Sequence, residues 1–354
     1  MNLNRAPEVL AMADALHLPS SVRPVDEILA FCREKIAGWL RGRRNLPSMT
    51  ELEAIVCEKL HLIFEEFHSD HELKEIIRKY CAAGEYAFAS LAADFDDKTY
   101  ATLLERSKAT RYSRDRYVAV VDCRGAKSSR RFFTRWHEIA HLLTLYRQLE
   151  LPFHRSRDDN SSLERLMDKI AADVGFYEPI IRPVLNSEIV RGGGLTFDAI
   201  ENVRQQFCRE ASFQATLKAC VSRVNHPVLY VEASLALKKN EREMLASEQT
   251  EFLPRTLPRK KLRAVVTVPN SAAHGMIELH RNMQVPATSI IYRTFFGDEA
   301  LGDAFEMVGR ENLRDWKHSD GSSLPELDVR VHARRFPGGV YAMICPIVAG
   351  VRAQ

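Results

Sequence analysis

Hydrophobic residues in the N-terminal quarter of the chain recur at the spacing of amphipathic helices. In residues 25–40, and again in residues 51–67, apolar side chains return every three or four positions, which places them on one face of a helix. The basic loop of residues 41–44 separates the two segments, and we interpret it as a solvated turn rather than a nucleic-acid contact. Residues 1–84 are therefore predicted to form a helical region.

Strand-like patterns begin after this region. Residues 86–95 are a candidate strand, and residues 116–122 are a clearer one because they are rich in β-branched and aromatic side chains. A helix is predicted to follow, with Ser128 or Ser129 as its N-cap and its end near Arg147.

A second helix in the same region is predicted to begin at Ser161 and to reach Phe176. Pro179 and Pro183 come next, and because proline interrupts helices we expect them to mark its end. These helices and strands define a predicted core over residues 85–190.

The segment from 191 to 253 is predicted to be helical. The three glycines at 192–194 indicate a flexible joint or a tight turn. Thr196 is expected to cap one helix and Ser212 the next, with a spacing that resembles a small helix-turn-helix.

The C-terminal part, residues 262–354, is predicted to be an α+β domain that follows a connector rich in lysine and arginine. Its candidate strands are residues 262–268, 287–292, 327–335 and 340–348. The Pro337-Gly338-Gly339 sequence fits a hairpin turn between the last two. The fold class of the whole chain is predicted to be α+β.

Composition narrows the class of protein. A chain of 354 residues suggests about two or three domains and can bury a large core without structural metal, so a bound metal ion would serve chemistry. The net charge of +3 points to no partner, and the seven scattered cysteines fit a reducing compartment. Because we find neither a membrane-spanning run nor a signal peptide, we expect a cytoplasmic protein without a membrane partner.

The most informative motif is H-E-x-x-H, which occurs as residues 137–141. On a helix, His137 and His141 lie one above the other on the same face, so both imidazoles can reach one metal ion. Glu138 stands beside the first histidine and can take a proton from a water molecule that zinc activates. The motif lies within an apolar helix, where histidines without polar partners would be costly.

A catalytic zinc site needs a third protein ligand. The metzincin pattern is excluded because Thr144 and Arg147 stand where its glycine and third histidine belong. Glu164, in the first turn of the next helix, is one candidate, although Ser161 and Glu164 also match a capping box. Position alone does not decide between these roles, and His154 is a rival ligand in a predicted loop.

Two segments resemble the ImmA/IrrE metallo-endopeptidases. Residues 133–143, FTRWHEIAHLL, are similar to that family's F-T-x-x-H-E-[LI]-[GA]-H-L-L segment, and residues 164–172, ERLMDKIAA, to its second signature, E-x-x-A-[ND]-x-F-A-A. The resemblance covers residues 85–185. It implies a mostly helical zincin-like core with a small sheet, in which His137, His141 and Glu164 hold zinc. Glu138 is then the catalytic base.

The departures from that pattern surround the ligands. Met167 and Ile170 replace the family's alanine and phenylalanine at packing positions, Arg135 and Trp136 replace a pair of small residues, and the L-L-M-P ending is absent. The chain therefore resembles a divergent member. The helix-turn-helix-like segment is also similar to one found in many members, and the strand pattern of residues 262–350 resembles a GAF-like domain.

The sequence does not single out a residue that would stabilise the oxyanion. Tyr146, Tyr177, His154 and Arg131 are equal candidates for stabilising an oxyanion. Asp168, one turn after Glu164, is expected to orient His141 by a hydrogen bond, as the family's Asn or Asp at that position implies.

Two basic runs also need an interpretation. One lies beside the metal motif (Arg124, Lys127, Arg130, Arg131 and Arg135), and the other lies near the C-terminal domain (Arg255, Arg259, Lys260, Lys261 and Arg263). We interpret both as solvated faces, with contact to DNA or an acidic partner as the alternative. The second helix of the helix-turn-helix-like segment carries little positive charge, which argues against direct reading of DNA.

Two functions follow. The first is a zinc endopeptidase that cuts a regulatory protein, such as a DNA-binding repressor or an antitoxin-like partner, as the resemblance implies. The second is a catalytically weak, peptidase-like regulator that binds DNA or a protein and senses a ligand through its C-terminal domain. Substitution of Glu138 distinguishes them, since only the first needs its carboxylate.

Overall fold

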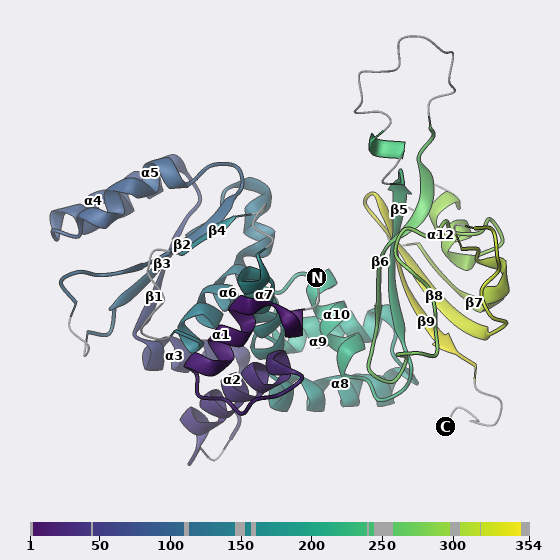
Figure 1. The fold of residues 1–354 in the computed structure, drawn as a ribbon, viewed down its shortest axis with the longest axis horizontal. Coiled ribbons are helices and arrows are strands. Elements are labelled where there is room, and N and C mark those ends of the chain that lie inside the picture. Colours follow the sequence, from purple (N-terminus) through teal and green to yellow (C-terminus); the bar gives the residue numbers. More distant parts are fainter. Residues whose placement is uncertain are drawn as a thin grey trace, which may run out of the picture. The chain divides into compact units, whose positions relative to one another are not determined.

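The chain divides into two compact units, residues 1–219 and residues 220–354, and each is described by itself (Figure 1). The computed structural model describes residues 3–43, 45–109, 113–145, 161–238, 241–243, 258–297, 305–318 and 320–347, and the backbone of 153–156. Both units combine helices with a small sheet, so the predicted α+β class is confirmed. None of the described helices is long and apolar enough to cross a membrane.

The sheet of the first unit has the strand order β1-β3-β2-β4. Its strands are β1 (Leu62–Phe67), β2 (Thr99–Glu105), β3 (Tyr117–Asp122) and β4 (Phe153–Ser156). β1 runs parallel to β3, whereas β2 is antiparallel to both of its neighbours. Every residue of β3 is buried, as expected for an inner strand covered on both faces.

The helices described in residues 1–223 are, in chain order, η1 (Leu3–Arg5), α1 (Pro7–Ala15), α2 (Pro24–Leu40), α3 (Met49–Leu60), α4 (Asp70–Ala82), η2 (Tyr86–Ser90), α5 (Leu91–Asp94), η3 (Gly125–Arg130), α6 (Arg131–Leu143), α7 (Ser162–Val174), α8 (Glu178–Gly192), α9 (Phe197–Phe207) and α10 (Phe213–Arg223). Helices α3, α4, α5 and α6 pack against strands of this sheet (Figure 1). α6 packs against α7 and α3 and against strands β2 and β3, so it lies between the sheet and the other helices.

The helix predicted over residues 51–67 is wrong in its second half. α3 ends at Leu60, and His61 adopts a left-handed backbone conformation with φ of 55° that stops the helix. Residues 62–67 then pair with β3. Their apolar side chains suit a buried strand as well as a helix, which is why periodicity misassigned them.

The strand predicted over residues 86–95 is also wrong, because this segment forms η2 and α5. Phe88, Leu91 and Phe95 are buried in a cluster with Tyr80 of α4. The segment is therefore held by packing on a helix and does not enter the sheet.

The ends of the helices that carry the metal motif differ from the prediction. Ser128 and Ser129 do not cap α6; their hydroxyls donate to the carbonyls of Gly125 and Ala126 within η3, and α6 begins at Arg131. Its predicted end, Arg147, lies outside the described residues. Ser161 does cap α7, as predicted.

α7 stops at Gly175, before the prolines that were expected to end it. A Cβ at Gly175 would lie 2.6 Å from the carbonyl oxygen of Ala171 and 2.9 Å from the ring of Trp136, so only glycine fits there. Pro179 instead stands in the first turn of α8, where no amide hydrogen is needed, and Pro183 lies inside that helix.

Thr196 and Ser212 behave as predicted. Each hydroxyl accepts a hydrogen bond at the start of its helix, from Ala199 for α9 and from Ala215 for α10. The three glycines before them form a tight turn, in which Gly193 has φ of 67° at the end of α8.

The second unit is built on an antiparallel sheet with the order β6-β5-β9-β8-β7. Its strands are β5 (Leu229–Ala236), β6 (Lys261–Pro269), β7 (Glu306–Asn312), β8 (Asp328–Phe336) and β9 (Gly339–Pro346). Helix α12 (Ile290–Phe296) packs against β7, β8 and β9, and a short turn, η5 (Leu313–Asp315), follows β7. The core of the unit lies between the sheet and α12.

Three predicted strands of this unit are confirmed as β6, β8 and β9, and the Pro337-Gly338 hairpin turn joins the last two. The strand predicted over residues 287–292 is wrong, because Ser289 caps α12 there. The segment 191–253 is not helical throughout: it contains β5, which pairs with both β6 and β9. Its alternating apolar residues were overlooked.

Candidate metal centre

His137 and His141 stand on the buried face of α6. Trp136, Ile139 and Ala140 of the same helix have no exposed surface, and the two histidine side chains are only 1% and 2% exposed. Their ring centroids lie 5.0 Å apart and their Nε2 atoms 3.2 Å apart. The i, i+4 spacing therefore brings both imidazoles to one point, as the motif predicts.

Glu164 reaches the same point from α7. Ser161 caps this helix by accepting a hydrogen bond from the backbone nitrogen of Glu164. The carboxylate of Glu164 lies 2.9 Å from Nε2 of His137 and 3.3 Å from Nε2 of His141. The structure therefore shows the serine half of the predicted capping box, and it brings the carboxylate of Glu164 to the histidines.

Asp168 lies one turn further along α7. Its Oδ1 is 2.9 Å from Nδ1 of His137, whereas the sequence assigned Asp168 to His141. The prediction named the wrong histidine because helical spacing gives a face of α7 but not its register against α6. A carboxylate accepts, so Nδ1 of His137 donates its hydrogen to Asp168, and Nε2 is the ring atom that faces Glu164 and His141.

This arrangement favours a cation. Two imidazole Nε2 atoms and a carboxylate face one another in a buried place, and such close contacts are stable only when a proton or a metal ion lies between them. The three ligand atoms lie within 4.8 Å of one another, so His137, His141 and Glu164 can hold a metal ion. A tetrahedral ion with bonds of ~2.1 Å would separate two ligand atoms by about 3.4 Å. The two Nε2 atoms are 3.2 Å apart, and the two oxygens of Glu164 lie 2.9 Å from Nε2 of His137 and 3.3 Å from Nε2 of His141.

The ionisation state of Glu164 also suits a metal ligand. Burial alone would raise the pKa of this carboxyl group, but the hydrogen bonds and charges of His137 and His141 outweigh burial and hold the pKa well below its usual range. Glu164 is thus ionised at neutral pH, as a metal ligand requires.

The site is closed behind the histidines and open on the side of α7. The side chain of Asp168 is 52% exposed and that of Glu164 is 14% exposed, whereas Glu138 is fully buried. The three side chains can therefore be reached from solvent past α7.

Packing fixes α6 in place. Met167 and Ile170, the two departures from the family pattern, are completely buried, which confirms them as packing positions. The hydroxyl of Thr144 donates to the carbonyl of Ala140 at the end of α6, and Lys35 of α2 donates to the carbonyl of Leu143. Helix α6 is therefore tied at its C-terminal end to α2.

Two of the four oxyanion candidates, Arg131 and Tyr177, have side chains that the structure describes, and both have their contacts away from the metal ligands. Arg131 pairs with Glu66 and Glu210, and Tyr177 lines a separate hollow with Arg33 of α2. Tyr146 lies outside the described residues. His154 belongs to strand β4 rather than to the predicted loop, and its side chain also lies outside the description.

The basic run beside α6 is not a solvated face. Arg124 and Lys127 bind Asp122 at 2.6 and 2.7 Å, and Arg124 also pairs with Asp70. Arg135 pairs with Glu53 and Glu66. Arg130 lies over the ring of Tyr100 at 5.0 Å. The charges of Arg124, Lys127 and Arg135 are thus matched within the first unit. Asp122 is two and five positions away from its partners in the chain, whereas Asp70 and Glu66 lie 54 and 69 positions away, and sequence reasoning missed these pairings.

The helix-turn-helix-like segment also has many buried residues on its second helix. The buried residues of α10, the second helix of this segment, are Thr216, Leu217, Ala219, Cys220 and Val221. Helix α10 is therefore partly a packing element, with Lys218 among its exposed positions.

Comparison with known proteins adds no assignment: no family model matches the chain, and no curated protein matches it. The chemistry of the site therefore rests on the residues themselves.

Proposed function

We propose that the protein is a zinc-dependent metallo-endopeptidase. The observation that carries this proposal is the convergence of His137, His141 and Glu164 on one point, beside a fully buried Glu138. Two histidines and a glutamate form the ligand set of zinc peptidases, which keep one position free for water and substrate.

Zinc is the ion that this ligand set suits best among the common metals. Imidazole nitrogens bind zinc, copper, iron and nickel well, whereas magnesium and calcium prefer oxygen ligands. The hydrogen bond of Asp168 to His137 fixes the ring so that Nε2 faces the ion.

The proposed chemistry divides between the ion and the chain. Bound zinc would polarise the scissile carbonyl and lower the pKa of the attacking water to about 7. Glu138 takes a proton from the water and passes it to the leaving amine. Its burial keeps solvent from competing for the proton, and Glu164 and Asp168 hold the histidines in the orientation that this transfer needs.

The similarity to the ImmA/IrrE signatures extends the proposal to fold and substrate. We infer that the first unit is a zincin-like core and that the antiparallel sheet of the second unit belongs to a GAF-like domain. The substrate class that this implies is a regulatory protein, such as a DNA-binding repressor or an antitoxin-like partner. Cleavage of such a substrate would take place in the cytoplasm.

Metal analysis of the purified chain gives the first test. We expect about one zinc per chain in the wild type, and loss of most of it in His141→Ala and in Glu164→Ala, because each removes a ligand. Glu178→Ala, on α8, is the matched control and should retain the ion. A wild-type protein without metal after purification and zinc dialysis would contradict the proposal.

Glu138→Gln tests the chemistry separately from metal binding. The variant should keep its zinc and lose proteolysis by roughly a hundredfold or more, because a general base is removed. New N-termini can be compared in cells that produce wild type or Glu138→Gln. Identical sets of N-termini would favour the regulator that binds without cutting.

A further inference from the structure

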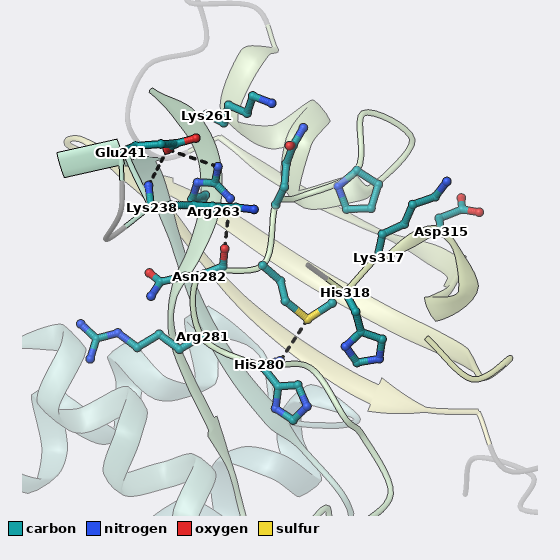
Figure 2. Close-up of a pocket in the computed structure, with 13 residues that line it drawn as sticks. Lys238, Glu241, Lys261, Arg263, His280, Arg281, Asn282, Asp315, Lys317 and His318 are labelled. Atoms are coloured by element: carbon teal, nitrogen blue, oxygen red, sulfur yellow. Dashed lines mark hydrogen bonds and ion pairs between the residues drawn. The ribbon is translucent and has the colours of Figure 1, made fainter. Parts of the chain in front are cut away.

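The second unit contains a cavity that the peptidase chemistry does not use. It has a volume of about 560 Å³ and lies between β6, the end of β5, the loop of residues 280–286 and the segment of residues 315–318 (Figure 2). Cavities of roughly 300–1,000 Å³ hold small organic molecules in most proteins. Five cationic side chains but only two carboxylates line it, so its lining is basic.

Arg263 of β6 lies at the bottom of this cavity and is only 2% exposed. Its guanidinium contacts the carbonyls of Ala236 and Asn282 at 3.3 and 3.2 Å, and lies 3.7 Å from Glu241 (Figure 2). These contacts are long for hydrogen bonds to a charged donor. A guanidinium has five N–H groups, so a buried arginine held this way keeps donor capacity for an anion.

Three further cations of the cavity are unmatched. In the part of the chain that the structure describes, no carboxylate pairs with Lys261, Arg281 or Lys317. The two carboxylates of the lining have other partners: Glu241 accepts a hydrogen bond from the backbone of Lys238 and lies 3.7 Å from Arg263, and Asp315 accepts a hydrogen bond from Thr288. The lining therefore gathers five cations and two carboxylates around one space, an excess of positive charge that an entering anion would offset.

The backbone holds these side chains in place. The loop that carries His280 and Arg281 is hydrogen-bonded to β6, from Asn282 to Ala264 and from Val285 to Leu262. Asn282 takes a left-handed conformation with φ of 70° at the turn. A site whose groups are positioned before binding loses less entropy when its ligand arrives.

We propose that this cavity binds a small molecule that carries a phosphate group. Arg263 and the cations around it supply donors and charge for the phosphate oxygens. The rings of His280 and His318, 6.0 Å apart, and the side chain of Met283 offer surface to an organic part. A DNA duplex is the less suitable partner, because its backbone cannot reach an arginine buried at the bottom of a cavity. The proposal does not depend on the metal chemistry.

Calorimetric titration of the full chain tests this site with pyrophosphate, adenosine monophosphate, adenosine and a short DNA duplex. We expect the two phosphate compounds to bind with Kd below about 1 mM, adenosine not to bind, and added salt to weaken binding. Arg281→Ala and Lys317→Ala should each weaken it by roughly tenfold, because each removes a charge-assisted contact. Both residues are exposed, so the variants should fold.

Arg310→Ala is the matched control, because Arg310 is an exposed cation of β7 that does not line the cavity. The proposal is overturned if neither phosphate compound binds, or if Arg310→Ala weakens binding as much as the cavity variants. Binding of the duplex alone, with the same dependence on Arg281 and Lys317, would likewise replace it with a nucleic-acid surface.

Discussion

The cations beside helix α6 and the cations of the cavity in the second unit have opposite environments. Around α6, Arg124, Lys127, Arg131 and Arg135 each meet a carboxylate of the same unit. In the cavity, Lys261, Arg281 and Lys317 meet none among the described residues. Matched cations stabilise the fold in which they lie, whereas unmatched cations gathered around a cavity are available to a ligand.

Arg135→Ala should produce the largest effect on stability. Glu53 is nearly buried, and burial already raises its pKa although Arg135 opposes the shift. Removing Arg135 leaves this carboxylate uncompensated, so the free energy of unfolding should fall by about 3–5 kcal/mol. Chemical denaturation measures it, with Arg130→Ala as the control that should change little. Equal losses of unfolding free energy in Arg135→Ala and Arg130→Ala would show that the ion pairs of Arg135 do not contribute to stability.

Asp122 gives a test that depends on pH. Burial would raise its pKa, but the donors of Arg124 and Lys127 outweigh burial and lower it. A lowered pKa in the folded state means that the stabilisation is complete above the unfolded value of about 3.9 and is lost as pH falls below it.

Asp122→Asn should therefore lower the free energy of unfolding by about 1–3 kcal/mol at pH 7. The gap between wild type and variant should shrink as the pH of the denaturation experiment falls from 5 towards 3. A gap that stays constant over this range would mean that the charge of Asp122 contributes nothing.

The smallest effect is expected in the cavity. Without phosphate compounds, Arg281→Ala and Lys317→Ala should change the free energy of unfolding by no more than about 0.5 kcal/mol. The double variant Arg281→Ala/Lys317→Ala should raise the free energy of unfolding slightly, because it removes two like charges from the same cavity. A loss comparable to that of Arg135→Ala would show that these cations have structural partners, and the comparison between the two regions would then fail.

Local patterns were enough to predict much of the candidate site. His137, Glu138 and His141 follow from a motif of five residues, and Glu164 follows from a resemblance in the next helix. The register between the two helices was not predictable in this way, which is why Asp168 was assigned to His141 instead of His137. Register depends on packing, such as the approach of Trp136 to Gly175, and no local pattern encodes it.

The same limit applies to the fold and to the charges. The apolar pattern of residues 62–67 is compatible with either a helix or a strand. Pairing with β3, more than 50 positions away, makes the segment a strand. Arg131 appears in the sequence as one of a run of cations, but its partner Glu66 lies 65 positions earlier. Whether a basic run is matched therefore becomes visible only when the chain is folded.

The position of Glu164 in the first turn of α7 has a further consequence for chain connectivity. An ion held by His141 and Glu164 would cross-link residues 23 positions apart, since 164 minus 141 is 23. Such a cross-link removes loop-closure entropy from the unfolded chain, as a disulfide of the same span would. The metal ion would then serve as a staple between α6 and α7 in addition to its chemical role.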